Sequence, residues 1–278
     1  MRLIDAPGGP EIQAALKNEH VQKIVDILLQ VRVIDKDFFE DIADFLQKCD
    51  GEMPAKKVAK KLRVLREYGF KSIDINGQRV LSSPSSNELF LALESLYNAE
   101  KGIINYRRGA IVELLTYKLV TAVRKKIEPL SLQDKDAFSH LIDGVKTPTN
   151  RCNSRCQDDE CWSNQCLDNQ SGRYRSKQVD VIVLLEKKYQ IEGYSCKINI
   201  HSIKPIELID IFYLSKEAKK LNYATHVGVV SFDHSSIIWQ RLEDLSVPDA
   251  PHMEVLYFPE EITAYGLDNL SDLMQSPF

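Results

Sequence analysis

The sequence predicts an α/β protein in which a mixed central sheet, flanked by helices, follows a small helical domain. Three observations lead to this prediction. Apolar residues recur every three or four positions over residues 11–69, which is typical of amphipathic helices. After residue 178, two apolar runs have the period of strands, and a helical pattern separates them from a third such run. Residues 82–86 are small and polar with one proline, and we interpret them as a linker between two domains.

Composition and charge limit the classes of protein to which this chain can belong. It has 278 residues, of which 44% are hydrophobic and 27% charged, close to the averages of globular proteins. No run of about 18 apolar residues is present, so we exclude a membrane-spanning protein. The net charge of -4 argues against a surface that coats nucleic acid throughout, although it allows a local basic patch. The first residues lack the apolar core of a signal peptide, so we expect a cytoplasmic protein in a reducing compartment.

The first domain, residues 1–86, has the pattern of a winged-helix-like module. Residues 11–49 fit two amphipathic helices, and a third begins after Gly51, with Pro54 in its first turn, and ends near Gly69. Residues 72–81 alternate apolar and polar on both sides of an Asn-Gly pair, which is the strongest short-range signal of a β-hairpin. Three helices and a hairpin also serve as an interaction or dimerisation module, which is the alternative interpretation.

The third helix of this domain is strongly basic in a chain that is acidic on average. Its cations are Lys56, Lys57, Lys60, Lys61, Arg63 and Arg66. We interpret this helix as a surface that contacts the phosphates of nucleic acid. An ordinary solvated helix face is the alternative.

The second domain, residues 87–278, combines helices with strands. Helices are predicted over residues 87–100, 104–127, 131–145 and 205–221, and strands over 179–185, 189–200, 225–232 and 255–258. Residues 150–170 form a polar loop without a periodic apolar face, so something else must order it. This order of elements predicts a mixed sheet flanked by helices.

Asp180 and Lys197 are the first candidates for chemistry. Asp180 is an acid inside an apolar strand, where a carboxylate is costly unless it pairs or binds a cation. On the next strand Lys197 shares a face with Ser195, because side chains alternate with period two, whereas Glu192 faces the other side. Asp180 and Lys197 could therefore meet across the hairpin. A purely structural ion pair is the alternative interpretation.

A third candidate, Glu113, lies in the middle of the helix over residues 104–127, with Arg107 and Arg108 near its start. The order of these residues resembles that of the PD-(D/E)XK nuclease superfamily. The core of that superfamily is a helix with a Glu, a hairpin with an Asp and then Glu-x-Lys, a helix and a strand. Glu113, Asp180 and Ser195-Cys196-Lys197 follow this order over roughly residues 100–235. The resemblance implies a restriction endonuclease-like fold and a nuclease that needs Mg²⁺ or Mn²⁺.

The chain departs from the family pattern at Ser195, which stands at the position of the second acid. Glu192 has the wrong strand parity to replace it. Some restriction enzymes of the superfamily supply the displaced acid from the following helix, and here Glu207 and Asp210 lie three residues apart on one face of that predicted helix. If neither acid takes part, the protein is a degenerate relative that binds DNA without cutting it.

The resemblance implies a role for each candidate. Asp180 and one acid of the following helix, Asp210 or Glu207, would be ligands of Mg²⁺, whereas Glu113 would hold a second metal or a water on it. Lys197 would orient or deprotonate the attacking water, or neutralise the transition state. Carboxylates that hold Mg²⁺ suit phosphodiester hydrolysis, because the reaction builds negative charge on the phosphate.

Four cysteines gather in the polar loop of residues 150–170: Cys152, Cys156, Cys161 and Cys166. Four thiolates in a loop without a core fit a structural Zn²⁺ in a reducing compartment, with an iron–sulfur cluster, disulfides or free thiols as alternatives. Cys49 and Cys196 stand apart, and we expect them to be small buried apolar residues. Arg173 and Arg175 add a second basic stretch just before Asp180.

Together these features predict a Mg²⁺-dependent endonuclease that hydrolyses DNA, with restriction or defence as its setting. A homodimer is expected if both strands are cut, because one such centre hydrolyses one strand at a time. Two other classes stay open. One is a DNA-binding or regulatory protein that retains the nuclease fold, and the other is a zinc-containing interaction adaptor.

Overall fold

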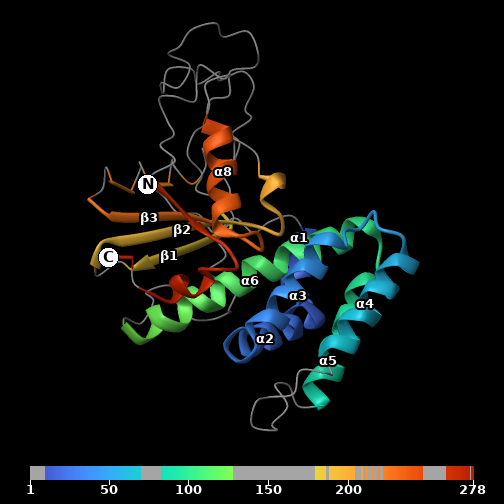
Figure 1. Cartoon of the computed structure of the whole chain (residues 1–278). Coiled ribbons are helices and arrows are strands. Elements are labelled where there is room, and N and C mark those ends of the chain that lie inside the picture. Colours follow the sequence, from blue (N-terminus) through green and yellow to red (C-terminus); the bar gives the residue numbers. More distant parts are fainter. Residues whose placement is uncertain are drawn as a thin grey trace, which may run out of the picture.

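A mixed sheet lies between two helical layers in the computed structural model of this chain (Figure 1). The structure describes residues 10–69, 83–127, 179–185, 188–203, 208, 211, 214–215, 218–219, 222–246, 261–275 and 277–278. The α/β class and the mixed sheet predicted from the sequence are confirmed. None of the described helices combines the length and the apolar content that crossing a bilayer requires.

Three helices open the described chain: α1 (Pro10–Leu16), α2 (Glu19–Ile34) and α3 (Lys36–Lys48). The side chain of Asn18 accepts a hydrogen bond from the N–H of Val21 (3.2 Å) at the start of α2, and Asp35 accepts one from Phe38 (3.0 Å) at the start of α3. Such acceptors satisfy N–H groups that have no partner within the first turn. The two amphipathic helices predicted over residues 11–49 correspond to α2 and α3, whereas the first residues of that range form a separate short helix, α1, that was not predicted.

The basic helix α4 (Ala55–Gly69) ends where the sequence predicts. Pro54 lies just before the helix, and its carbonyl accepts hydrogen bonds from the N–H groups of Lys57 and Val58. Val58 and Leu62 bury the apolar stripe of α4. The hairpin predicted over residues 72–81 lies outside the described residues, so the winged-helix-like domain stays a prediction.

Helix α5 (Ser83–Tyr97) begins inside the segment that we interpreted as a linker, so that interpretation is wrong for residues 83–86. Serine and proline are favoured in the first turn of a helix as well as in linkers, and composition does not separate the two. The boundary predicted after residue 86 falls inside α5, which packs against α2. Helices on both sides of residue 86 contribute to one buried cluster, and the division into two domains stays a prediction.

The longest described helix, α6 (Lys101–Ile127), lies between the helical layer and the sheet. It packs against α1 and α2 and also against the first two strands, and Figure 1 shows it passing beneath the sheet. Ile111, Val112 and Leu114 are all buried although they point in different directions from the helix axis. A helix that is buried on several sides is typical of a central position. The helix predicted over residues 104–127 is confirmed.

The sheet has the strand order β1-β2-β3-β4. Its strands are β1 (Val181–Leu185), β2 (Gln190–Lys197), β3 (Ala224–Ser231) and β4 (Ile262–Tyr265). β1 and β2 form the predicted antiparallel hairpin, and β3 and β4 continue the sheet in parallel. β4 was not predicted from the sequence, and the strand predicted over residues 255–258 lies outside the described residues.

Different helices cover the two faces of the sheet. Tyr194 and Cys196 lie on the face that packs against α6. Ile191 and Val229 lie on the opposite face, which packs against α8 (Ser235–Ser246) and against helical residues between 208 and 219. These helical residues belong to the helix predicted over residues 205–221, and those that pack on the sheet are Leu208, Ile211, Leu214 and Ala218.

Two 3₁₀ helices complete the described structure, η2 (Ile200–Ser202) after β2 and η4 (Leu270–Met274) after β4. The guanidinium of Arg32 on α2 donates to Ser271 Oγ (2.9 Å) and to Met274 Sδ (3.2 Å) in η4. The segment after β4 is therefore bonded to the N-terminal helices.

Candidate functional site

Asp180 is held at the end of β2 by hydrogen bonds. It lies in a bend directly before β1, so the prediction that it stands inside the strand is wrong by one position. Its Oδ2 accepts a bond from the backbone N–H of Cys196 (2.6 Å) and another from the hydroxyl of Ser195 (3.3 Å). Two donors on one oxygen fix the orientation of this half-buried carboxylate.

Ser195 is buried and faces Asp180. The predicted nuclease pattern has its second acid at the position of Ser195. Its hydroxyl donates to the Asp180 carboxylate, and the hydroxyl adds no charge to the site. Lys197 is the last residue of β2 and is half-buried opposite Ser231 of β3. In the register of the hairpin Val181 pairs with Tyr194, so Asp180 lies beside Ser195, and Lys197 lies two positions further along β2. The predicted contact between Asp180 and Lys197 stays a prediction.

Three charged side chains influence the thiol of Cys196. Burial raises the pKa of this thiol well above its usual value, the carboxylates of Asp180 and Glu113 raise the pKa further, and the ammonium of Lys197 opposes them. Glu113 on α6 and Asp180 before β1 therefore lie at the same end of β2 as Cys196 and Lys197, and we call this end the open end of β2 because Glu113, Asp180 and Lys197 are only partly buried.

The opposite end of β2 carries a buried ion pair that was not predicted from the sequence. Arg124 of α6 donates to Glu192 through Nε (2.8 Å) and Nη2 (3.0 Å), and the hydroxyl of Tyr194 donates to the same carboxylate (2.6 Å). Arg124 is 1% exposed and Glu192 is 0% exposed. A buried carboxylate such as that of Glu192 needs a cation as partner, and Arg124, near the end of an apolar helix, was the residue in the sequence that could have indicated this pair.

The two ends of β2 fix how α6 lies along the strand. Thr116 of α6 lies beside Cys196, and Arg124 binds Glu192. From Thr116 to Arg124 the helix rises about 12 Å, and from Glu192 to Cys196 the strand rises about 13 Å. The later helix residue contacts the earlier strand residue, so α6 runs antiparallel to β2, and the similar spans mean that Glu113, before Thr116, lies toward the open end of β2.

A ring of aromatic side chains surrounds the ion pair. His226 Nε2 lies 2.8 Å from the hydroxyl of Tyr265, and the rings of both pack against Tyr194. Burial lowers the pKa of His226, so this imidazole is neutral at neutral pH. Burial raises the pKa of Tyr265 to about 12. This end of β2 is therefore apolar apart from one matched pair of charges.

Asp233 is an acid near the open end that we did not single out from the sequence. Its Oδ2 accepts from the N–H of Ile200 (2.6 Å) and from the hydroxyl of Ser231 (2.7 Å). These bonds join the segment after β2 to the end of β3. Ligands commonly bind at the carboxyl ends of parallel strands, and Asp233 shapes that edge here.

The fit to a metal ion rests on two carboxylates. Asp180 and Glu113 have carboxylate oxygens, the kind of ligand that Mg²⁺ prefers. Over the part of the chain that the structure describes, no three His, Cys, Asp or Glu side chains form a group that would hold a metal ion. Glu207 and Asp210, the predicted additional acids, lie outside the described residues, as do the predicted zinc ligands Cys152, Cys156, Cys161 and Cys166. Cys49 and Cys196 are buried, as expected, and burial raises the pKa of Cys49 to about 11.

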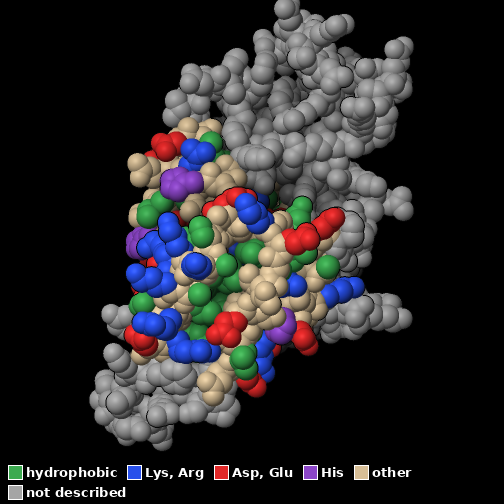
Figure 2. All heavy atoms as spheres, turned by 90° about the vertical axis from the view of Figure 1, so that its right-hand side faces the viewer, with side chains coloured by type: hydrophobic (Ala, Val, Ile, Leu, Met, Phe, Trp, Pro, Cys, Tyr) green, Lys and Arg blue, Asp and Glu red, His purple; other side chains and the backbone are tan. Residues whose placement is uncertain are grey.

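The predicted nucleic-acid contacts fall into three groups. Five cations of α4 are exposed: Lys56, Lys57, Lys60, Lys61 and Arg63. Figure 2, which looks at the right-hand side of Figure 1, shows several Lys and Arg side chains on that face of the molecule. Arg107 is half-buried and donates to the carbonyl of Ser95 (3.2 Å). Arg173 and Arg175 lie outside the described residues.

Arg108 does not lie on the surface, so its predicted contact with nucleic acid is wrong. It is 4% exposed, and it donates to the carbonyls of Leu46 (2.7 Å) and Gln47 (2.8 Å) at the end of α3. A cation is favoured there because the last carbonyls of a helix lack partners and carry partial negative charge. The side chain joins α6 to α3.

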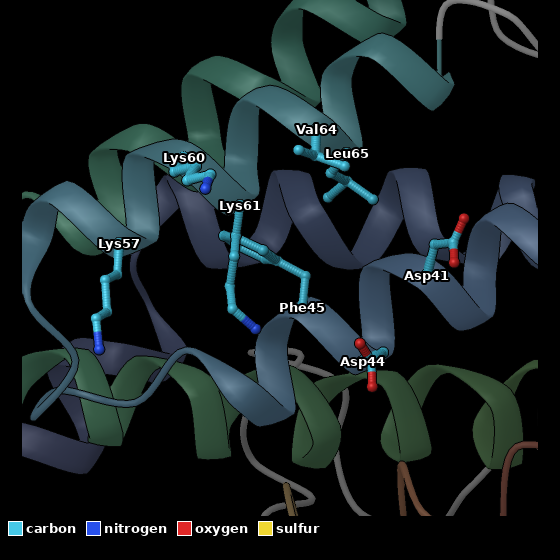
Figure 3. Close-up of a pocket in the computed structure, with 8 residues that line it drawn as sticks. All are labelled: Asp41, Asp44, Phe45, Lys57, Lys60, Lys61, Val64 and Leu65. Atoms are coloured by element: carbon cyan, nitrogen blue, oxygen red, sulfur yellow. The ribbon is translucent and has the colours of Figure 1, made fainter.

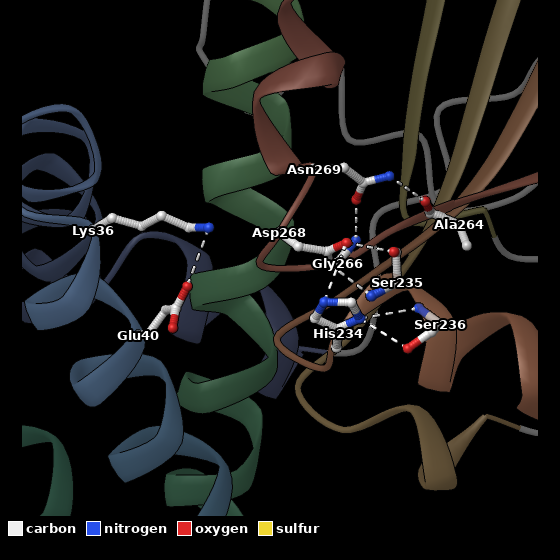
Figure 4. Close-up of polar contacts among 9 residues, drawn as sticks. All are labelled: Lys36, Glu40, His234, Ser235, Ser236, Ala264, Gly266, Asp268 and Asn269. Carbon is white, nitrogen blue, oxygen red and sulfur yellow. Dashed lines mark hydrogen bonds and ion pairs between the residues drawn. The ribbon is translucent and has the colours of Figure 1, made fainter.

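A serine, a histidine and an aspartate also meet at the start of α8 (Figure 4). Ser236 Oγ lies 2.8 Å from His234 Nδ1, and His234 Nε2 lies 3.5 Å from Asp268 Oδ2, in the order of a nucleophilic relay. The first-turn N–H groups are already used, because Ser235 donates to Asp268 (2.7 Å) and Ile237 donates to the carbonyl of His234 (2.9 Å). No donor remains among them for an oxyanion, so this exposed cluster is a helix cap.

Comparisons with protein families, with curated proteins and with solved structures found no match to this chain.

Proposed function

We propose that this protein is a metal-dependent nuclease of the PD-(D/E)XK type that hydrolyses DNA phosphodiester bonds. The observation that carries the proposal is that Ser195 and Cys196 hold the carboxylate of Asp180 at the end of β2 where Lys197 lies, while α6, the helix of Glu113, packs against the same strand. Glu113, Asp180 and Lys197 come from a helix, the start of a hairpin and its second strand, followed by helical residues and a parallel strand, in the order that the family resemblance requires. The restriction endonuclease-like fold and a cytoplasmic role in restriction or defence belong to this proposal.

Each residue has a task that its surroundings support. Asp180 and Glu113 would hold Mg²⁺, and the hydrogen bonds from Cys196 and Ser195 keep Asp180 in one orientation. When bound, Mg²⁺ supplies positive charge at the phosphate and lowers the pKa of water. Lys197, half-buried at the end of β2, would orient the attacking water or neutralise the charge that develops on the phosphate.

The remaining parts of the proposal concern DNA binding, the additional metal ligand, a structural zinc site and dimerisation. The exposed lysines of α4 would contact DNA phosphates, as in a winged-helix-like module. Glu207 or Asp210 would supply the acid that Ser195 lacks. The four cysteines of residues 150–170 would hold a structural Zn²⁺. A homodimer would allow both strands to be cut.

One observation favours a second function, a DNA-binding protein that has lost catalysis. Ser195 occupies the position of the second acid and donates its hydroxyl to Asp180. Two carboxylates would give the metal more negative charge than a carboxylate and a hydroxyl do. This alternative predicts DNA binding that needs no metal.

The test is cleavage of plasmid and linear DNA with Mg²⁺ or Mn²⁺ by the wild type, Asp180→Ala and Lys197→Ala. We expect each substitution to reduce the rate by about 100-fold or more, because each removes a group that acts in the transition state. The matched controls are Asp26→Ala and Lys36→Ala, which remove exposed charges on α2 and α3 and should keep the wild-type rate.

The outcomes separate the two functions. Cleavage by the wild type that both active-site variants retain would show that the site lies elsewhere. No cleavage, combined with DNA binding that weakens with salt and needs no metal, would favour the binding protein. No cleavage and no DNA binding would contradict both functions.

A further inference from the structure

A groove runs between α3 and α4 on the surface of the helical layer (Figure 3). Its volume is about 780 Å³. The floor is apolar: Phe45 and Leu65 are 5% and 6% exposed, and Val64 on the rim is 44% exposed. The ring of Phe45 packs edge-on against Tyr97, so this floor is part of the packed core and has a fixed shape.

The two sides of the groove carry opposite charges. Lys57, Lys60 and Lys61 line the side formed by α4, and Asp41 and Asp44 line the side formed by α3 (Figure 3). These lysines make no ion pair with any other residue that the structure describes. Burial and the neighbouring carboxylates, Asp44 first, raise the pKa of Asp41, so a cation beside it would be stabilising.

The length of the groove matches a helix. Along α4 its lining extends from Lys57 to Leu65, which corresponds to about 12 Å or two turns. A docked amphipathic helix presents apolar residues at positions i, i+3, i+4 and i+7, and these span about 10 Å. One edge of that apolar face would lie beside the lysines of α4 and the other edge beside the aspartates of α3.

Other occupants fit the groove less well. A nucleic-acid backbone carries only negative charge and would meet Asp41 and Asp44 on one side. A second copy of this chain, with its groove facing this one, would enclose a hollow between two concave surfaces. A convex helix fills the groove and can offer an anion to one side and a cation to the other.

We propose that the groove between α3 and α4 is a docking site for an amphipathic helix of a protein partner. Acids along one edge of this helix face Lys57, Lys60 and Lys61, cations along the other edge face Asp41, and apolar residues fill the floor over Phe45 and Leu65. The inference does not depend on nuclease activity. It adds a protein partner to a surface whose lysines also belong to the proposed DNA contacts, so a docked helix would weaken DNA binding.

The test measures the affinity of the full chain for three synthetic helical peptides by fluorescence anisotropy at physiological ionic strength. All three have the same apolar face. One has acids along one edge and cations along the other, one has acids along both edges, and one has cations along both edges. We expect the peptide with opposite edges to bind at least about tenfold more tightly than the other two, because each of these places like charges against one side of the groove.

Variants of the groove sharpen the test. The triple variant Lys57→Glu, Lys60→Glu and Lys61→Glu makes both sides acidic, so the peptide with two basic edges should become the tightest ligand. Val64→Asp should weaken all three peptides, because it puts a charge at the apolar rim. The matched control is Leu91→Asp, since Leu91 is 61% exposed on α5 outside the groove, and it should leave every affinity unchanged. Circular dichroism shows whether each variant is folded.

Three results would overturn the proposal. The first is no binding of any peptide. The second is equal binding of the peptides with opposite edges and with two acidic edges, which would make α4 a general anion surface. The third is wild-type affinity in the folded Val64→Asp variant, which would show that the peptides bind outside the groove.

Discussion

The two ends of β2 both carry acidic and basic side chains, but these are buried and paired at one end and partly exposed at the other. At one end the carboxylate of Glu192 is fully buried and meets Arg124 and Tyr194 in three hydrogen bonds. At the other end Asp180 and Glu113 stay half-exposed around Cys196, near the ammonium of Lys197. The first end matches its charges within the protein, whereas the second gathers acids that a cation from solution could join.

This contrast shows how one helix can serve both ends. The buried pair is costly to desolvate and therefore tolerates little displacement of α6 along β2. Glu113 lies three turns before Arg124 on the same helix, so a fixed register at one end determines where Glu113 sits at the other. The buried end is thus the reference for the position of the candidate site.

The largest expected effect follows from breaking the buried pair. Glu192→Ala should lower the free energy of unfolding by about 3–5 kcal/mol, because it leaves the Arg124 guanidinium buried without its partner. Denaturant unfolding followed by circular dichroism measures this loss. The double variant Arg124→Met, Glu192→Leu is the control and should be markedly more stable than the single variant. Equal losses in both variants would show that packing, and not the unpaired charge, dominates this end.

At the open end, Ser195→Asp tests whether a cation completes the site. A second carboxylate beside Asp180 should lower the free energy of unfolding by about 1–3 kcal/mol in EDTA, through like-charge repulsion and burial. Millimolar Mg²⁺ should recover the loss, because a cation that binds the folded state stabilises it. Ser195→Ala should show no such dependence on Mg²⁺ beyond that of the wild type. A loss in Ser195→Asp that Mg²⁺ leaves unchanged would contradict a metal site here.

A smaller effect is expected in the pH dependence of stability, through His226 at the buried end. Burial lowers the pKa of His226 in the folded state, so below about pH 6.5 the unfolded chain binds the proton more readily. His226 should therefore reduce stability as the pH falls below that value, by no more than about 1.4 kcal/mol per pH unit, with no effect at higher pH. His226→Gln should remove this component from a plot of unfolding free energy against pH. An unchanged slope in the variant would assign the dependence to other groups.

The smallest effect concerns an ion pair near the surface that joins α6, the helix of Arg124, to α2. Lys118 of α6 pairs with Asp26 of α2, and their side chains are 30% and 52% exposed. Lys118→Ala should change the free energy of unfolding by less than about 1 kcal/mol, because solvent screens exposed charges. Thermal unfolding in low and high salt measures the difference. A loss as large as that of Glu192→Ala would remove the distinction between buried and exposed pairs on α6.

The spacing of apolar residues predicted the helices and strands that are buried on one side or on all sides. The helices over residues 11–49 and α4, the length of α6 and the hairpin of β1 and β2 follow from it directly. The start of α5 did not, because its Ser83 and Pro84 are equally typical of a linker and of a first helical turn. β4 is only four residues long, too short for alternation to distinguish it from a loop.

The candidate site was predictable where it depends on strand parity and not where it depends on packing between distant elements. Parity placed Ser195 and Lys197 on one face and Glu192 on the other. It did not reveal that Arg124, 68 positions earlier, would meet Glu192, nor that Arg108 would turn inward to the end of α3. Contacts of this kind depend on how α6 lies against the sheet and the helices, which no local pattern encodes.

The bond from Arg32 to η4 has a consequence for the order of folding. Its two partners, Ser271 and Met274, are 239 and 242 positions away along the chain. At a synthesis rate of about 5–20 residues per second, Ser271 and Met274 are synthesised at least about ten seconds after Arg32. Contacts this distant in sequence slow folding, because a long loop must close before they contribute. The N-terminal helices are therefore synthesised early, but their contacts with η4 form late. Until η4 packs against α2, the side of α2 that carries Arg32 is accessible to chaperones and to other chains.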